Sequence, residues 1–71
     1  MRRLYVISSN IAEVGWDATT ETLEVQFHSG AVYQYADVPF AVFKAFVAAE
    51  SVGKYFHKHV RDSYRTTKVS G

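Results

Sequence analysis

An alternation of apolar and polar residues over positions 22–28 constrains the fold of this chain more than any other feature. The period of two is typical of a strand that buries one face. A Ser-Gly dipeptide follows it, and residues 31–35 then return to β-branched and aromatic side chains. The apolar positions of the first segment are Leu23, Val25 and Phe27. These features together predict a β-hairpin over residues 22–35.

The turn of this hairpin decides where Tyr33 and Tyr35 lie. The Ser-Gly pair fits poorly into the two-residue hairpin turns, which prefer Asn-Gly, Asp-Gly or a leading glycine. A type I turn with Gly30 in the left-handed region, forming a bulge, fits better. In that register Val25 faces Tyr33 and Leu23 faces Tyr35, so both rings join the apolar face as structural residues. The other register would place them on the polar face as a platform for stacked bases, and we favour the first.

Two further strands are expected before the hairpin, over residues 4–8 and 11–17, because both segments are rich in residues favoured on strands. Gly15 is expected to mark a bulge or a close approach of another segment. The residues expected on one face of the second strand are Ala12, Val14 and Trp16.

Two helices are expected after the hairpin. Pro39 suits a first helical turn, and Asp37 can serve near its cap. Ser51 can cap a second helix that runs to about Arg61. The apolar stripe of the first helix is Val42, Phe43, Phe46 and Val47. The inward stripe of the second has the spacing i, i+3, i+4, i+7, i+8 and consists of Val52, Tyr55, Phe56, His59 and Val60, so His59 is expected in the core.

The predicted fold class is therefore α+β, a small antiparallel sheet of three to four strands packed against two C-terminal helices. The 71 residues form a single domain, since so short a chain cannot build a second core. Its ordered core is expected over about 4–62, and 63–71 is expected as a basic, flexible tail. The chain has no cysteine, and its N-terminal apolar run is too short for an export signal or a membrane span. We expect a cytoplasmic protein without membrane contact.

Charge is distributed unevenly along the chain. Residues 4–53 carry a net charge of −5, whereas residues 54–71 carry +4. Within the basic part, one row of cations at i, i+4, i+7 forms a ridge on the second helix, which later cations can extend. Such a ridge suits phosphate groups, and a nearby tyrosine can stack on an unpaired base. The expected nucleic-acid-contacting residues are Lys54, Lys58, Arg61, Tyr64, Arg65 and Lys68. A solvated helix face with a frayed tail explains the same pattern equally well.

Catalysis and metal binding are not expected. The three histidines show no spacing that indicates a nucleophile with its base, and the four glycines form no phosphate-binding loop. His57 and His59 lie two residues apart on a helix, where they point in nearly opposite directions and cannot share one ion. We therefore expect no enzyme activity, no cofactor and no metal.

Three groups of residues together resemble the KTSC domain. They are Ser8-Ser9-Asn10-Ile11, the Tyr-x-Tyr of Tyr33 and Tyr35 with Val38-Pro39, and Gly53-Lys54-Tyr55-Phe56 with His59 and Arg61. This domain is named for its place at the C-terminus of some lysyl-tRNA synthetases and also occurs alone in small bacterial and phage proteins. The resemblance spans about residues 6–62 and implies RNA binding. Trp16, where the family often has tyrosine, is a mild departure.

Two functions from different classes follow from these features. The first is an RNA-binding accessory module that holds phosphates with the basic helix and tail. The second is a protein-interaction or homo-oligomerisation module that uses a strand edge or the aromatic surface of Trp16, Tyr5 and Phe40. The charge asymmetry and the resemblance favour the first.

Overall fold

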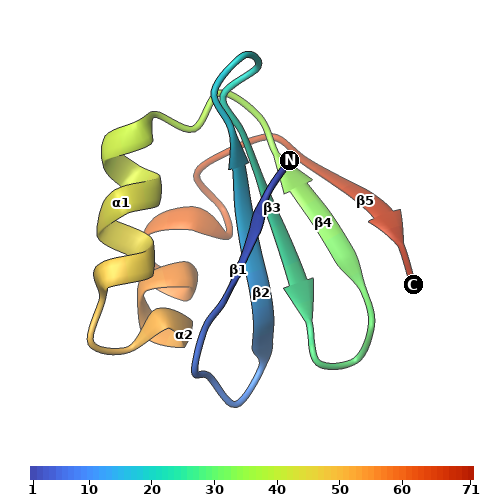
Figure 1. Ribbon diagram of the computed structural model, residues 1–71, viewed down its shortest axis with the longest axis vertical. Coiled ribbons are helices and arrows are strands. Elements are labelled where there is room, and N and C mark those ends of the chain that lie inside the picture. Colours follow the sequence, from blue (N-terminus) through green and yellow to red (C-terminus); the bar gives the residue numbers. More distant parts are fainter.

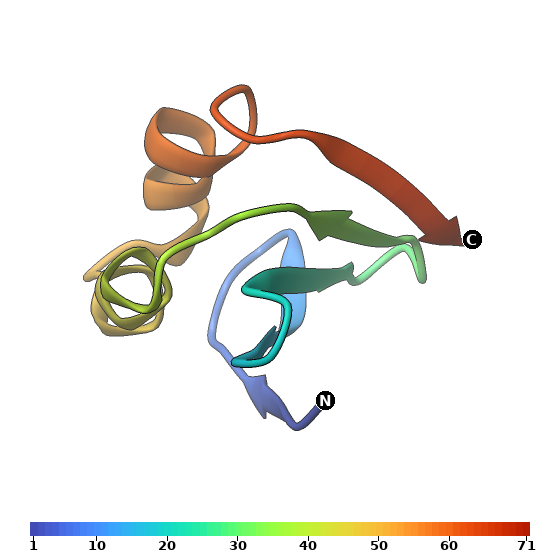
Figure 2. The same ribbon diagram turned by 90° about the horizontal axis from the view of Figure 1, so that it is seen from above.

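The computed structural model describes the whole chain, residues 1–71, as a five-stranded antiparallel sheet with two helical segments on one of its faces (Figure 1). The strands lie in chain order, and Figure 2 shows that the sheet is curved, with both helices on the same side. We call the face toward the helices the inner face. The strands are β1 (Arg3–Tyr5), β2 (Ile11–Asp17), β3 (Thr22–Phe27), β4 (Val32–Tyr35) and β5 (Thr66–Ser70). The helical segments are α1 (Phe40–Ala48), α2 (Val52–Tyr55) and the π-helical turn η1 (Phe56–Val60), which continues α2 directly.

The α+β class and the antiparallel sheet are confirmed, but two details of the prediction were wrong. The sheet has five strands rather than three to four, and the helices lie between β4 and β5 rather than at the C-terminus. Both errors come from residues 66–70, which lie within the segment expected as a basic, flexible tail. Three β-branched residues suit this segment to a strand, and the edge of β4 offers it unpaired backbone groups. Ala36 N–H also donates to the Arg65 carbonyl at 3.0 Å, just before the pairing begins.

The β3–β4 hairpin has the register that the Ser-Gly turn predicted. Val25 pairs with Tyr33 and Leu23 with Tyr35. Gly30 has a φ of 99° and donates from its N–H to the Phe27 carbonyl at 2.9 Å. Because directly paired residues point to the same face, both tyrosines lie on the inner face with the core.

The bulge of β2 lies at Ala12 and not at Gly15. The pairing with β3 shifts between Ile11 and Glu13, which leaves Ala12 as the extra residue. Ile11 thereby turns into the core, where it is only 1% exposed. Gly15 instead permits a close approach, because an added Cβ would lie 2.9 Å from the backbone oxygen of Arg2.

The core lies between the inner face and the helices. Phe46 of α1 is fully buried against it, and the connection from β4 to α1 is fixed by Val38, which is also fully buried. The indole Nε1 of Trp16 donates to the Val38 carbonyl at 2.8 Å. The core consists of Ile11, Val14, Leu23, Val25, Tyr35, Val38, Phe46, Val52, Phe56 and Val60.

The helix ends follow the sequence only in part. Ser51 caps α2 as predicted, since its Oγ accepts from the Lys54 N–H at 3.3 Å. Asp37 does not cap α1; it sits in the left-handed region with a φ of 57°, and Pro39 precedes the helix without a side-chain cap. Asp37 lies in the connection between β4 and α1, two residues before the N-cap position.

The second helix widens into a π turn, and this makes the prediction for His59 wrong. Arg61 N–H donates to the Phe56 carbonyl at 2.9 Å, a hydrogen bond that spans five residues. In so wide a turn successive residues are separated by a smaller angle than in an α-helix. Phe56 and Val60 therefore fill the sheet-facing side, while His59 is exposed with its ring centroid 4.5 Å from that of Tyr55.

Candidate functional site

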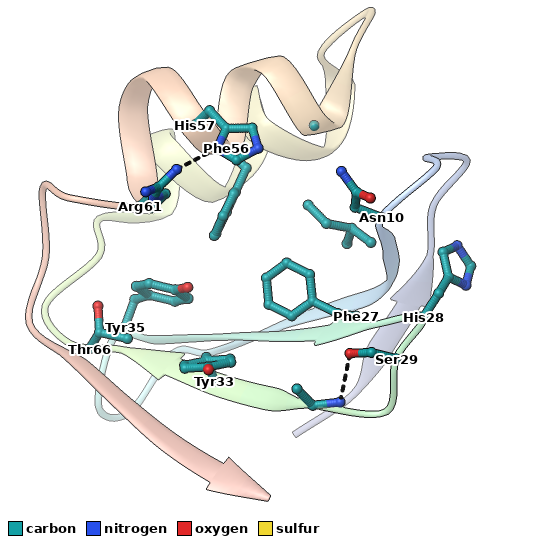
Figure 3. Close-up of a pocket in the computed structure, with 13 residues that line it drawn as sticks. Asn10, Phe27, His28, Ser29, Tyr33, Tyr35, Phe56, His57, Arg61 and Thr66 are labelled. Atoms are coloured by element: carbon teal, nitrogen blue, oxygen red, sulfur yellow. Dashed lines mark hydrogen bonds between the residues drawn. The ribbon is translucent and has the colours of Figure 1, made fainter. Parts of the chain in front are cut away.

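A cavity of about 580 Å³ opens between the inner face of the sheet and the α2–η1 segment (Figure 3). We call it the aromatic groove. The hairpin supplies one wall, the helical segment the opposite wall, and the loop after β1 one end. Its aromatic lining consists of Phe27, Tyr33, Tyr35 and Phe56, and its polar lining includes Asn10, His28, Ser29, His57, Arg61 and Thr66.

The four rings form a chain of edge-to-face contacts. The ring centroid of Phe27 lies 5.8 Å from that of Tyr33 and 5.5 Å from that of Phe56, and the centroids of Phe56 and Tyr35 are 5.7 Å apart. Figure 3 shows Phe56 pointing from the helix toward the sheet, with Phe27 between it and Tyr33. Such tilted pairs are favoured by the ring quadrupoles and hold each ring in a fixed orientation.

The four rings are not equally accessible. Tyr35 and Phe56 are only 3% and 4% exposed, whereas Phe27 and Tyr33 are half-buried. Burial raises the pKa of Tyr35 to about 12, with the neighbouring Tyr33 adding to the effect, so its hydroxyl stays neutral at physiological pH. Tyr35 thus belongs to the core, whereas Tyr33 packs against the core and keeps part of its side chain accessible.

Arg61 is the one formally charged residue that lines the groove, and no carboxylate lines it. Arg61 and His57 lie on the helical wall, with Arg61 Nη1 3.3 Å from His57 Nδ1. At the other end His28 Nε2 lies 2.9 Å from the Ser8 carbonyl, which orients the imidazole. Thr66 belongs to β5, so the strand that the sequence did not predict completes the site.

A second cavity of about 350 Å³ adjoins the groove beside the start of α2. Asn10, Gly53 and His57 line both, so the two form a continuous depression. Lys54 lines the second cavity together with the loop after β1, and Glu50 is its one acidic residue.

The predicted contact residues occupy different positions around this depression. Lys54 lines the smaller cavity and Arg61 the groove, while Lys58 and Arg65 are exposed and line neither. Lys68 pairs with Tyr33 across the β4–β5 ladder, so the two side chains point to the same face. Tyr64 is half-buried and packs against the core rather than standing free in solvent.

The basic residues are largely free of acidic partners within the chain. Arg61 Nε lies 3.9 Å from the Asp62 carboxylate, and both side chains are well exposed, which makes this contact weak. No other member of the predicted set has a carboxylate within 4 Å. The cationic surface therefore keeps its charge.

On the outer face of the sheet, by contrast, the acidic side chains are paired with Arg3 and Gln34. Arg3 contacts the Glu24 carboxylate at 2.7 Å and the Glu13 carboxylate at 3.7 Å, and Gln34 donates to Glu24 at 2.8 Å. Partial burial alone would raise the pKa of Glu24, but the hydrogen bonds from Gln34 and Arg3 outweigh it and lower that pKa. Two of the carboxylates of residues 4–53, those of Glu13 and Glu24, are thus paired on the sheet face away from the groove.

Sequence reasoning missed Asn10, His28 and Thr66 as groove residues. Neither Asn10 nor His28 lies in a local pattern that indicates a binding site, and Thr66 lies in the segment expected as a tail. Their proximity depends on how the helical segment stands over the sheet, which no local pattern records. No group of three or more His, Cys, Asp or Glu side chains lies close enough to hold a metal ion, and no helix is long and apolar enough to cross a membrane.

Comparisons with known proteins converge on one family. The KTSC domain profile matches residues 7–64. An uncharacterised protein of Stutzerimonas stutzeri is 40% identical over 58 residues, which cover 82% of each chain. A lysine–tRNA ligase of Trichormus variabilis is 39% identical over 62 residues, 87% of this chain but only 11% of the ligase. The crystal structure of a KTSC domain protein from Yersinia pestis superposes with a TM-score of 0.93 at 32% identity and covers 97% of both chains.

Proposed function

The chain belongs to the KTSC domain family, and we propose that it is a non-catalytic RNA-binding module whose contact surface is the cationic side of the aromatic groove. The observation that carries this proposal is the charge around the groove: Arg61 lines it, Lys68 flanks it, and no carboxylate lines it. Cations that replace condensed counterions supply most of the sequence-independent affinity for nucleic acid.

Two further points support the proposal. Related sequence occurs within lysine–tRNA ligases, as about a tenth of the length of the Trichormus variabilis enzyme, and such enzymes act on RNA. Lys54, at the adjoining cavity, extends the cationic surface, whereas Glu13 and Glu24 are engaged by Arg3 on the opposite face. A polyanion that approaches the groove therefore meets mostly positive charge.

The test compares two double variants that lose the same charge. Arg61→Gln with Lys68→Gln removes two cations beside the groove, and Arg2→Gln with Lys44→Gln removes two exposed cations elsewhere. Binding of a labelled single-stranded oligoribonucleotide is measured by fluorescence anisotropy across a salt series. The groove variant should bind at least about tenfold more weakly, because charged hydrogen bonds are lost. Its salt slope should fall by about 1.4, since each phosphate contact on a single strand contributes about 0.7.

The control variant should retain both the affinity and the salt slope. Equal losses in the two variants would mean that only net charge matters and would overturn the assignment of the groove. Failure of the unaltered protein to bind RNA at low salt would overturn the function itself.

A second candidate function is protein interaction or self-association through β1. Leu4, Tyr5 and Ile7 are 44%, 86% and 100% exposed on the edge strand of the sheet and the loop after it. Exposed apolar side chains beside a free strand edge are typical of an interaction surface. Trp16, by contrast, is half-buried between Phe40 and Phe43 and adds little to such a surface. Sedimentation of the chain and of Ile7→Lys separates the cases, because self-association through β1 would be lost in the variant.

A further inference from the structure

Deepening the proposed function, and resting on it, we infer that the aromatic groove is a pocket for one unpaired nucleobase, which stacks on Tyr33 while its phosphate lies at Arg61 and His57. The cationic surface alone explains attraction to any polyanion. The groove adds a ring-shaped apolar site that a phosphate chain without bases cannot use.

The ring faces of the groove are not equally available to a ligand. Tyr35 and Phe56 are closed off, so the half-buried Tyr33 and Phe27 provide the accessible aromatic surface. Phe27 meets Tyr33 at an interplanar angle of 85°. A planar ligand lying parallel to Tyr33 would meet Phe27 in the same edge-to-face arrangement, which aromatic rings favour. A nucleobase has the required shape, and its stacking on an aromatic side chain is a common mode of single-strand recognition.

Polar groups are distributed along the groove in an order that suits a nucleotide. Figure 3 shows Arg61 and Asn10 at opposite ends, with the rings between them. Asn10 is exposed, and its hydrogen bonds within the chain use backbone groups: its N–H donates to Ser8 Oγ and its carbonyl accepts from the His28 N–H. Its side-chain amide is therefore free for the edge of a base. Arg61 and His57 are adjacent at the other end, where they can donate to phosphate oxygens. A base and its phosphate carry complementary groups in the same order.

The size of the groove also suits a single nucleotide. A cavity of about 580 Å³ lies within the usual range for small-ligand sites, roughly 300–1,000 Å³. It is large enough for one nucleotide and far too small for a duplex. The inference therefore selects unpaired segments of RNA over double-stranded ones.

The experiment separates the base from the phosphate. Inorganic polyphosphate and oligouridylate are each titrated into the protein and into Tyr33→Leu, which keeps an apolar side chain but removes the flat ring. Tyr33→Leu should bind oligouridylate about 5- to 150-fold more weakly, the effect of losing one stacked base, and polyphosphate with unchanged affinity. Tyr5→Leu, on the outer face, is the matched control and should change neither affinity. Arg61→Gln should weaken both ligands.

Amide chemical shifts locate the ligand independently of any variant. In titrations monitored by ¹H–¹⁵N correlation spectra, uridine 5′-monophosphate should shift the amides of His28, Gly53, Arg61 and Thr66 saturably, whereas ribose 5-phosphate should affect only those near Arg61. This measurement also serves if Tyr33→Leu does not fold.

Each contrary outcome has a distinct meaning. Equal losses of oligouridylate and polyphosphate in Tyr33→Leu, or shifts that bypass the groove, would overturn the base pocket while leaving RNA binding intact. Absence of binding to either polyanion would overturn the proposed function as well. Saturable binding of a free peptide carboxylate to the groove, with no response to uridine 5′-monophosphate, would assign the pocket to a protein partner and overturn the inference.

Discussion

The inner face of the sheet has two halves that carry similar aromatic residues but bury them to different extents. Under α1, Trp16 is stacked against Phe43 at 6.1 Å and Phe46 is fully buried, so this half is closed. Under η1, Phe27 and Tyr33 keep part of their surface in the aromatic groove. α1 is a regular helix of nine residues, whereas the second helical segment widens into a π turn. Residue type alone therefore does not decide whether an aromatic ring is buried; the helical segment that packs above the ring does.

The largest effect on the free energy of unfolding is expected from Phe46, which is fully buried in the closed half. Phe46→Ala should lower the free energy of unfolding by about 3–5 kcal/mol, because it removes a large buried ring and leaves a cavity. A chain of this size has little stability to spare, so the variant should be substantially unfolded. Urea unfolding followed by circular dichroism checks this. Phe40→Ala, on the same helix but 53% exposed, should cost less than half as much, and equal costs would break the distinction.

Tyr35 lines the groove but is buried, and its ionisation tests whether water reaches its hydroxyl. The rise of its pKa from 10.0 to about 12 corresponds to about 3 kcal/mol. Because the folded pKa is raised, this contribution is complete below pH 10 and is lost as the pH climbs toward 12. The unfolding free energy should therefore fall more steeply between pH 10 and 12 in the unaltered chain than in Tyr35→Phe. Parallel curves would place the hydroxyl in solvent.

A smaller effect is expected from the hydrogen bond that ties β2 to the start of α1. Trp16→Phe keeps an aromatic ring but leaves the carbonyl of buried Val38 without the donor 2.8 Å away. The expected loss is about 1–3 kcal/mol, the cost of an unsatisfied buried acceptor. Thermal unfolding measures it against Tyr5→Phe, which removes a polar group from an 86% exposed ring. A variant as stable as this control would mean that water replaces the indole.

The smallest stability effect is expected in the open half. Tyr33→Leu should cost less than about 1.5 kcal/mol, because a half-buried ring is replaced by an apolar side chain of moderate size. The same change should produce the large loss of oligouridylate affinity described above. A heavy stability cost without a binding effect would assign Tyr33 to the core and remove the contrast between the halves.

Much of the fold could be predicted because it is recorded locally. The Ser-Gly turn fixed the register of Tyr33 and Tyr35, and Ser51 marked a helix start. β5 could not be recognised in the same way, since Thr66–Ser70 is exposed throughout and shows no alternation of buried and solvent-facing residues. Its strand state depends on the free edge of β4, which is distant in sequence.

The site was less predictable than the fold. The cations of the second helix were visible in the sequence, but the spacing that grouped them assumed a regular helix. The π turn changed the angles, so His59 faces solvent and Arg61 joins the groove. The groove itself exists only where the loop after β1, the hairpin, η1 and β5 meet. Four separate segments contribute, and no single segment carries its pattern.

Trp16 is the single indole of the chain, held in the closed half by Val38 and stacked on Phe43. The fluorescence emission of Trp16 therefore reports unfolding and should not change when a ligand enters the groove. Tyr33 lies in the open half and is one of five tyrosines, so a ring stacked upon it should quench only part of the tyrosine emission. The single indole thus provides an intrinsic optical probe of structural integrity that needs no added dye.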